Sequence, residues 1–358
     1  NQYNSKLIFH QDCFIQFYAL LLPNSMTSKP EPLSFESDVL QTFIFEQSQI
    51  RGEIVRLGAS WQTILSRKQY PPAIQRHLGE MVAAGALLSA TLKFSGTLII
   101  QAQGTGLVRL LVVECTADLG LRATIKLAND VTPETISSEA SLAELINPDG
   151  LGKLVITLDP SNRQEGQQAY QGIVPLSLHG QPITSIAQAI IAYMNYSEQL
   201  DTKIWLACNH QFAGGILLQK LPQLGGHSPL QKLTEEELDE AWERLPMLVQ
   251  TVNDAELLST PPSVLMNRLF TYETDQQTVR SFPLRHLQFS CQCSRKRVGN
   301  MLIMLGYDEV TDILEEQQQV ETTCDFCGQV YAFDAVDCKQ LFIARNLIDG
   351  MRPAKGKH

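Results

Sequence analysis

The sequence predicts an α+β protein: a large, mostly antiparallel sheet that carries a few helices, then a helical connector, then a small C-terminal zinc domain built on four cysteines. Three observations predict it. Strand-like segments separated by turn residues follow one another from residue 97 onward. Charged segments with helix-start signals fill residues 230–285. Two close cysteine pairs lie near the C-terminal end.

Composition and charge exclude some classes of protein. The chain has 358 residues, of which 44% are apolar and 18% charged, as in globular proteins with a real core. A formal net charge of −10 disfavours binding to a phosphate backbone, so we expect no nucleic-acid partner. No run of eighteen apolar residues occurs, so we expect no membrane partner either.

Residues 1–35 are expected to form a disordered extension. The apolar run from Leu7 to Leu22 is interrupted by polar residues such as His10 and Asp12, which argues against a secretory signal. The segment from Thr27 to Pro32 is typical of a linker.

Residues 36–228 are expected to form the α+β core. Residues 39–45 suggest a short amphipathic helix, and residues 49–57 a strand. Pro71 and Pro72 indicate the start of a buried helix that runs to about residue 93. A second helix is expected over residues 185–194. Further strands are expected over residues 97–103, 108–114, 121–127, 154–158, 170–176, 202–208 and 214–219. The Gly104-Thr105-Gly106 segment fits a hairpin turn better than a dinucleotide site.

Residues 229–286 are expected to form the helical connector. Thr234 and Glu237 have the spacing of a capping box, and the helix that follows is expected to stop at Pro246. Pro261 and Pro262 indicate the start of another helix. The connector has apolar stripes but too few residues to bury them alone, so it must dock on another part of the chain.

The zinc domain is expected over residues 287–348, with a loose basic tail over residues 349–358. It contains Cys291 and Cys293 at one-residue spacing, and Cys324 and Cys327 at two-residue spacing. Four thiolates suit tetrahedral Zn²⁺. The simpler alternative is four buried free cysteines without a metal.

Other residues near this site could act as ligands or could modify its thiols. His286 could replace one sulfur, although four sulfurs already complete a tetrahedron. Cys13, Cys115 and Cys208 are isolated, and Cys338 is an extra thiol near the cluster whose role is open. The basic run over residues 295–297 is expected to lower the pKa of nearby thiols.

A four-thiolate site couples metal binding, folding and redox state, because oxidation of two thiolates removes two ligands at once. The spacing makes a switch feasible without showing that one exists. No hydrolase, zinc-protease or phosphate-loop motif occurs, so we expect no enzyme. Widely separated close cysteine pairs in a large chain indicate a reducing compartment, and hence a cytoplasmic protein.

Several segments in this order resemble a known family. They are residues 51–53 (Arg-Gly-Glu), 87–94, 170–174, 197–200, 213–219 and 289–295. Together with the cysteine spacing, they resemble the redox-regulated zinc holdase of the heat-shock response, the thirty-three-kilodalton chaperonin family. The resemblance covers roughly residues 36–345.

The resemblance implies a specific function. In the reduced state Cys291, Cys293, Cys324 and Cys327 would bind zinc and keep the protein inactive. Oxidation would pair Cys291 with Cys293 and Cys324 with Cys327, release zinc, and unfold the zinc domain and then the connector. The exposed apolar surface would hold unfolded client proteins without ATP, and activation would be accompanied by homodimerisation. The alternatives are an enzyme or nucleic-acid-binding protein with a purely structural zinc ribbon, or a zinc-stabilised interaction module.

Overall fold

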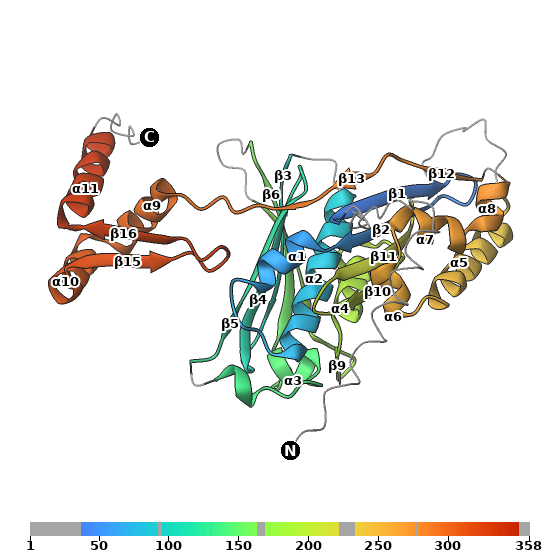
Figure 1. Ribbon diagram of the computed structural model, residues 1–358, viewed down its shortest axis with the longest axis horizontal. Coiled ribbons are helices and arrows are strands. Elements are labelled where there is room, and N and C mark those ends of the chain that lie inside the picture. The colour runs from blue at the N-terminus through green and yellow to red at the C-terminus, as the bar shows by residue number, and fades with distance from the viewer. Residues whose placement is uncertain are drawn as a thin grey trace, which may run out of the picture. The chain divides into compact units, whose positions relative to one another are not determined.

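The structure is a computed structural model that describes residues 37–91, 95–129, 131–162, 169–221, 233–276 and 278–350, with side chains described as far as residue 343 (Figure 1). The predicted extension over residues 1–35, the Gly-rich segment over residues 222–228 and most of the predicted tail lie outside these residues. Within them, the predicted α+β class is confirmed, and the strands of the core form two six-stranded sheets.

The first sheet, sheet A, has the strand order β10-β11-β2-β1-β12, and β13 also pairs with β1. All its pairs are antiparallel. Its strands are β1 (Val39–Phe45), β2 (Ile50–Leu57), β10 (Thr202–Cys208), β11 (Ala213–Lys220), β12 (Val279–Ser281) and β13 (Arg285–His286).

The second sheet, sheet B, has the order β14-β5-β4-β3-β6-β7. Its pairs are antiparallel except for β14, which lies parallel to β5. The hairpin between β3 and β4 turns at residues 104–107, as the glycines there predict. The strands of sheet B are β3 (Gly96–Gln103), β4 (Val108–Thr116), β5 (Gly120–Leu127), β6 (Lys153–Pro160), β7 (Tyr170–Pro175) and β14 (Gln288–Phe289).

Helix α2 (Pro72–Ala90) contacts strands of both sheets and is the centre of the main core (Figure 1). It begins at the predicted proline pair, and 14 of its 19 residues are buried. Helix α4 (Ile186–Tyr193) packs beside it, with Ser185 accepting a hydrogen bond as its N-cap. The smaller elements of the core are α1 (Ala59–Leu65), η1 (Pro133–Thr135), α3 (Leu142–Ile146), β8 (Ser177–Leu178), β9 (Gln181–Pro182) and η2 (Met194–Glu198).

Two expectations about individual elements are wrong. Residues 39–45 form strand β1. Its β-branched and aromatic side chains are buried on both faces of the sheet, and a strand of this kind does not show the period-two pattern that would identify it in the sequence. Pro246 lies inside helix α5 (Glu235–Gln250), where it is buried and leaves only one carbonyl of the preceding turn without its usual partner. The capping box of Thr234 and Glu237 is present as predicted.

The connector helices pack on sheet A. Besides α5 they are α6 (Asp254–Ser259), α7 (Pro262–Leu269) and α8 (Thr271–Asp275). Successive side chains of β2 point to opposite faces of sheet A, so the sheet contributes to two apolar clusters. Val55 and Leu57 pack in the main core with α2, whereas Ile50 and Ile54 pack in a second apolar cluster with the connector. We call this second cluster the connector interface.

After the connector the chain joins both sheets before it reaches the cysteines. Strands β12 and β13 pair with β1, and β14 pairs with β5. The C-terminal module then comprises α9 (Arg295–Leu305), α10 (Tyr307–Gln317), the hairpin of β15 (Gln319–Thr323) and β16 (Val330–Asp334), and α11 (Ala335–Gly350). Its fully buried cluster is small: Leu302, Val310, Val320, Phe333 and Cys338.

Candidate metal centre

The four predicted cysteine sulfurs meet at one place. The Sγ atoms of Cys291, Cys293, Cys324 and Cys327 all lie within 4.8 Å of one another. Within the described residues, this is the only group of three or more histidine, cysteine or acidic side chains placed to hold a metal ion. All four thiols are free and partly exposed.

Local backbone structure positions each pair. The first pair lies between β14 and α9, and Ser294 caps α9 by accepting a hydrogen bond from the N–H of Arg297. The second pair forms the turn of the β15–β16 hairpin. There Gly328 N–H donates to the Cys324 carbonyl at 2.8 Å, and Gly328 has a φ of 73°, which favours glycine. We call residues 324–327 the knuckle.

The sulfur geometry fits a tetrahedral metal ion. Sγ of Cys291 is 3.7 Å from Sγ of Cys324, and Sγ of Cys293 is 3.3 Å from Sγ of Cys327. A Zn–S bond of about 2.3 Å places tetrahedral sulfurs about 3.8 Å apart. An all-sulfur donor set favours zinc among the common divalent ions. The residues therefore fit Zn²⁺, and both short contacts join one cysteine pair to the other.

The thiol pKa values show the effect of crowding four sulfurs. Burial raises the pKa of Cys327 to about 12, and its neighbours Cys293 and Cys291 raise it as well. The pKa of Cys324 is also raised, with burial as the largest cause. Four thiolates so close together repel one another, so a bound cation would favour their deprotonated forms.

The pKa of Cys291 is lowered, in contrast to those of Cys324 and Cys327. Burial raises its pKa, but hydrogen bonds from the N–H of Cys293 and from Arg122 lower it, and the result is a pKa of about 7. Nη1 of Arg122 lies 3.4 Å from Sγ of Cys291. Tyr331 Oη donates to Sγ of Cys293 at 3.2 Å, which raises the pKa of Tyr331 to about 12. Cys291 is thus more readily present as a thiolate than Cys324 or Cys327.

The basic run affects one nearby thiol as predicted: burial raises the pKa of Cys338, and Arg295 opposes that rise. In the basic run, Arg295 binds Asp337 and the Ala332 carbonyl, and Arg297 binds Gln292. The arginine that contacts a cysteine is Arg122 of β5, 169 residues before Cys291 in the chain. No motif marks it, because an arginine in a strand is ordinary until the fold brings it to a thiol.

The remaining candidates lie apart from the centre. His286 is exposed on β13, where it pairs with Val39. Cys338 is buried in the small core of the C-terminal module. Cys115 is buried in the main core, where burial raises its pKa to about 11. Cys208 ends β10, and burial raises its pKa too. Cys13 lies outside the described residues.

Two charged side chains of the core, Lys68 and Arg122, also contact the knuckle. Nζ of Lys68, in the α1–α2 loop, lies 3.3 Å from a carboxylate oxygen of Asp325 and 3.2 Å from Oγ1 of Thr124 on β5. The guanidinium of Arg122 lies 4.1 Å from the centre of the Phe326 ring.

Among the described helices, none combines the length and apolar character needed to cross a bilayer.

Comparison with known proteins agrees with the fold and the site. The family described as "Hsp33 protein" matches residues 38–334. The 33 kDa chaperonin of Methylobacillus flagellatus is 43% identical over 316 residues, which cover 88% of this chain and 97% of that protein. The 33 kDa chaperonin of Chromobacterium violaceum is 43% identical over 305 residues, covering 85% and 94%.

A solved structure shares the fold. The crystal structure of the 33 kDa chaperonin (heat shock protein 33 homolog) from Thermotoga maritima has a TM-score of 0.65 and 18% identity, and the match covers 86% of this chain and 99% of that one. With the family match over residues 38–334 and relatives at 43% identity, the chain belongs to the Hsp33 family, whose relatives are named 33 kDa chaperonins.

Proposed function

We propose that this protein is a redox-regulated, ATP-independent holdase. Its inactive form is reduced and binds zinc, and oxidation of the cysteine centre activates it. The observation that supports the proposal most is the connector interface: helices α5 to α8 cover an apolar face of sheet A, and three short strands, β12 to β14, link them to the cysteine centre. The proposed parts are a core over residues 36–228, a connector over residues 229–286 and a switch domain over residues 287–348.

In the reduced form, Cys291, Cys293, Cys324 and Cys327 are the proposed ligands. Bound Zn²⁺ would neutralise the thiolates and tie the knuckle to the start of α9. Among the side chains that the structure describes, the buried cluster of the C-terminal module has five, which is little for an independent fold. Its folding would therefore depend on the metal, as in other small metal-bound modules.

Oxidation would remove the ligands in pairs. For each pair, two thiolate sulfurs give up one electron each and form one S–S bond, while one hydrogen peroxide accepts both electrons and, with two protons, leaves as two waters. The proposed pairs are Cys291 with Cys293 and Cys324 with Cys327. The four Sγ atoms lie within 4.8 Å of one another without being bonded, so the two sulfurs of each pair must approach to about 2.05 Å before their bond closes.

Release of the connector would uncover two complementary surfaces. On sheet A these include the fully buried side chains of Phe43, Ile54 and Ile216. On the connector, Leu245, Leu265 and Phe270 are equally buried. An apolar surface of this kind binds unfolded chains without directional contacts, which suits a holdase with many clients.

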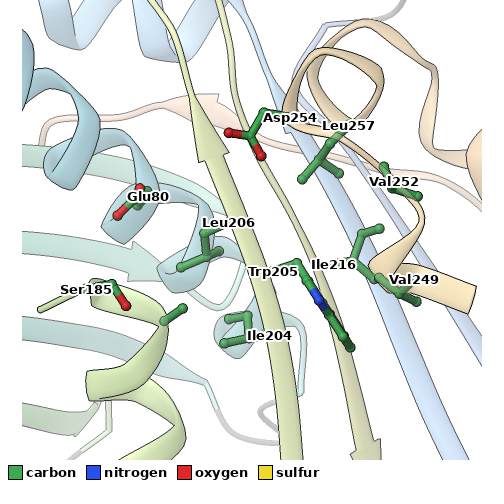
Figure 2. A pocket seen from close by; sticks show the side chains of 11 residues that line it. Glu80, Ser185, Ile204, Trp205, Leu206, Ile216, Val249, Val252, Asp254 and Leu257 are labelled. Atoms are coloured by element: carbon green, nitrogen blue, oxygen red, sulfur yellow. The ribbon is translucent and has the colours of Figure 1, made fainter. Parts of the chain in front are cut away.

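The packing of the connector leaves a gap at the β10 edge of sheet A. A cavity of about 280 Å³ opens along β10 and is lined on one face of this strand by Ile204 and Leu206 and on the other by Trp205. Figure 2 shows Val249, Val252 and Leu257 of the connector region on one side, and Glu80 and Ser185 of the core on the other. Because β10 is the edge strand here, we expect undocking to begin near this gap.

The partners follow from this proposal. They are unfolded client proteins and, on activation, a second copy of the chain. Zn²⁺ is the proposed metal, and the cytoplasm, which keeps thiols reduced, is the proposed location. No nucleic-acid or membrane partner is proposed, and no enzymatic activity.

The test compares reduced and peroxide-treated protein. Zinc release is followed with a colorimetric chelator, and light scattering follows aggregation of a thermally unfolding client. We expect about one zinc per chain to be released, as four thiolates require, together with suppressed aggregation. The proposal is wrong if zinc leaves and clients still aggregate. A protein with a purely structural zinc ribbon would lose its function on oxidation instead.

A further inference from the structure

Strand β5 of the core contacts both halves of the cysteine centre. Ahead of the first pair, Ser290 N–H donates to the Leu121 carbonyl at 2.9 Å, as an extension of the parallel pairing between β14 and β5. At the second pair, Arg122 lies against Phe326, and Lys68 joins Asp325 to Thr124. The centre is therefore held on β5 at neighbouring positions of the strand.

Of these residues, Arg122 makes the largest number of polar and aromatic contacts. Its Nε and Nη2 both donate to one carboxylate oxygen of Glu114, at 2.9 Å and 2.6 Å. Glu114 is its direct cross-strand partner on β4. The two side chains are only 16% and 20% exposed. Glu114 thus fixes the plane of the guanidinium before Arg122 contacts anything in the switch domain.

The remaining surfaces of the guanidinium point to the cysteine centre. Nη1 donates to Sγ of Cys291 at 3.4 Å, and one face lies 4.1 Å from the centre of the Phe326 ring, between Cys324 and Cys327. One side chain therefore contacts residues of both pairs. By comparison, the Lys68–Asp325 pair is open to solvent, with 38% and 76% of the side chains exposed, so it holds the knuckle only weakly.

We propose that Arg122, oriented by Glu114, is a positioning residue that slows oxidation of the cysteine centre. A hydrogen bond to a metal-bound thiolate withdraws charge from the sulfur and makes it a weaker nucleophile toward peroxide. The contact with Phe326 resists the movement that disulfide formation requires. Both effects lower the rate at which peroxide oxidises the cysteine centre. This inference rests on the proposed function, because it adds a control within the core to the proposed switch.

The test uses the full-length, reduced, zinc-loaded protein and the variant Arg122→Gln. Zinc release after peroxide addition is followed with a colorimetric chelator, and cysteine loss is followed by mass spectrometry. We expect release about fivefold or more faster than in the wild type, as loss of a charge-assisted hydrogen bond implies. Arg122→Lys should restore part of the delay, and Glu114→Gln should accelerate release to a smaller degree.

Lys126→Gln is the matched control, because Lys126 lies four residues along the same face of β5 and is exposed. It should release zinc at the wild-type rate. Equal rates for Arg122→Gln and the wild type, or equal acceleration by Lys126→Gln, would overturn the proposal. Thermal unfolding of the core shows whether Arg122→Gln is folded, and Glu114→Gln carries the test if it is not. Zinc release is measured separately from client aggregation. This inference can therefore fail while the proposed function stands, and the proposed function can fail while Arg122 still slows zinc release.

Discussion

Arg56 on strand β2 donates a hydrogen bond from Nε to the carbonyl oxygen of Leu258, 2.9 Å away. Leu258 lies in the last turn of α6, where carbonyl groups lack partners within the helix. Arg56 is only 4% exposed, and its guanidinium lies 4.4 Å from the centre of the Phe212 ring. A buried polar contact thus crosses the boundary between the core and the connector, within a largely apolar interface.

Replacement of Arg56 with Met is expected to loosen the connector in the reduced protein. The Leu258 carbonyl would lose its donor inside the boundary, a loss of about 1–3 kcal/mol in the free energy of connector opening. Hydrogen exchange over residues 254–260 measures it, and exchange should become faster. Arg268→Met is the control, because Arg268 is largely exposed in its ion pair with Glu256. Unchanged exchange in Arg56→Met would contradict this reading of the contact.

Replacement of Phe270 with Ala is expected to give holdase activity without oxidant. The ring is fully buried, with its centre 5.4 Å from that of Phe43 and 5.0 Å from that of Phe45. Its removal leaves a cavity at the connector interface and costs about 3–5 kcal/mol of docking free energy. Client aggregation is measured with reduced, zinc-loaded protein. The exposed neighbour Tyr272, changed to Ala, should have no effect; a silent Phe270→Ala variant would show that the interface does not control activity.

Removal of the metal under reducing conditions is expected to unfold the C-terminal module and to leave the main core folded. Structural zinc supplies on the order of 10 kcal/mol of folding free energy to such modules. Hydrogen exchange should become fast at Val320 and Phe333, in the small cluster, and stay slow at Val55 in the main core. The control is chelator added to protein with excess zinc. A module that keeps slow exchange after the metal has left would show that five buried side chains suffice.

The stability of the core is expected to fall as pH rises toward 8. Glu53 is 1% exposed, and burial raises its pKa from 4.5 to about 8, against the lowering effects of Arg51 and Arg285. Between these pH values the unfolded chain has released a proton that the folded chain keeps. The free energy of unfolding should therefore decrease by up to about 1.4 kcal/mol per pH unit and level off above pH 8.

Urea unfolding of the reduced protein between about pH 5 and about pH 9 measures this dependence. The fluorescence of Trp61, buried in the main core, reports on the region that contains Glu53. Glu53→Gln, which cannot ionise, should lose the slope over this window. A slope that is the same in both proteins would assign the pH dependence to other groups.

The sequence was most informative where chemistry and local pattern coincide. Cysteine spacing led to the sulfur cluster, and Pro71 with Pro72 marked the start of α2. The capping box at Thr234 and Glu237 marked the start of α5. Each of these signals lies within a few residues of the feature that it predicts, so no knowledge of the fold is needed.

Long-range packing was the part that local pattern could not supply. The strand at residues 39–45 has no clear alternation, because Leu40 faces α2 while Phe43 faces the connector and both are buried. The need for the connector to dock was foreseen, but its partner surface on sheet A was not. Arg122 was missed for the same reason: its role depends on a contact made across 169 residues.

The pairing of β12 and β13 with β1 has a consequence for the activated protein. In the reduced form these two short strands occupy the outer edge of sheet A. If they leave with the connector, β1 becomes an edge strand with a row of unpaired backbone N–H and C=O groups. An extended segment of another polypeptide could then pair with β1 regardless of its side chains. Activation would thus offer a hydrogen-bonding template, and the same edge would promote self-association when no other chain is bound.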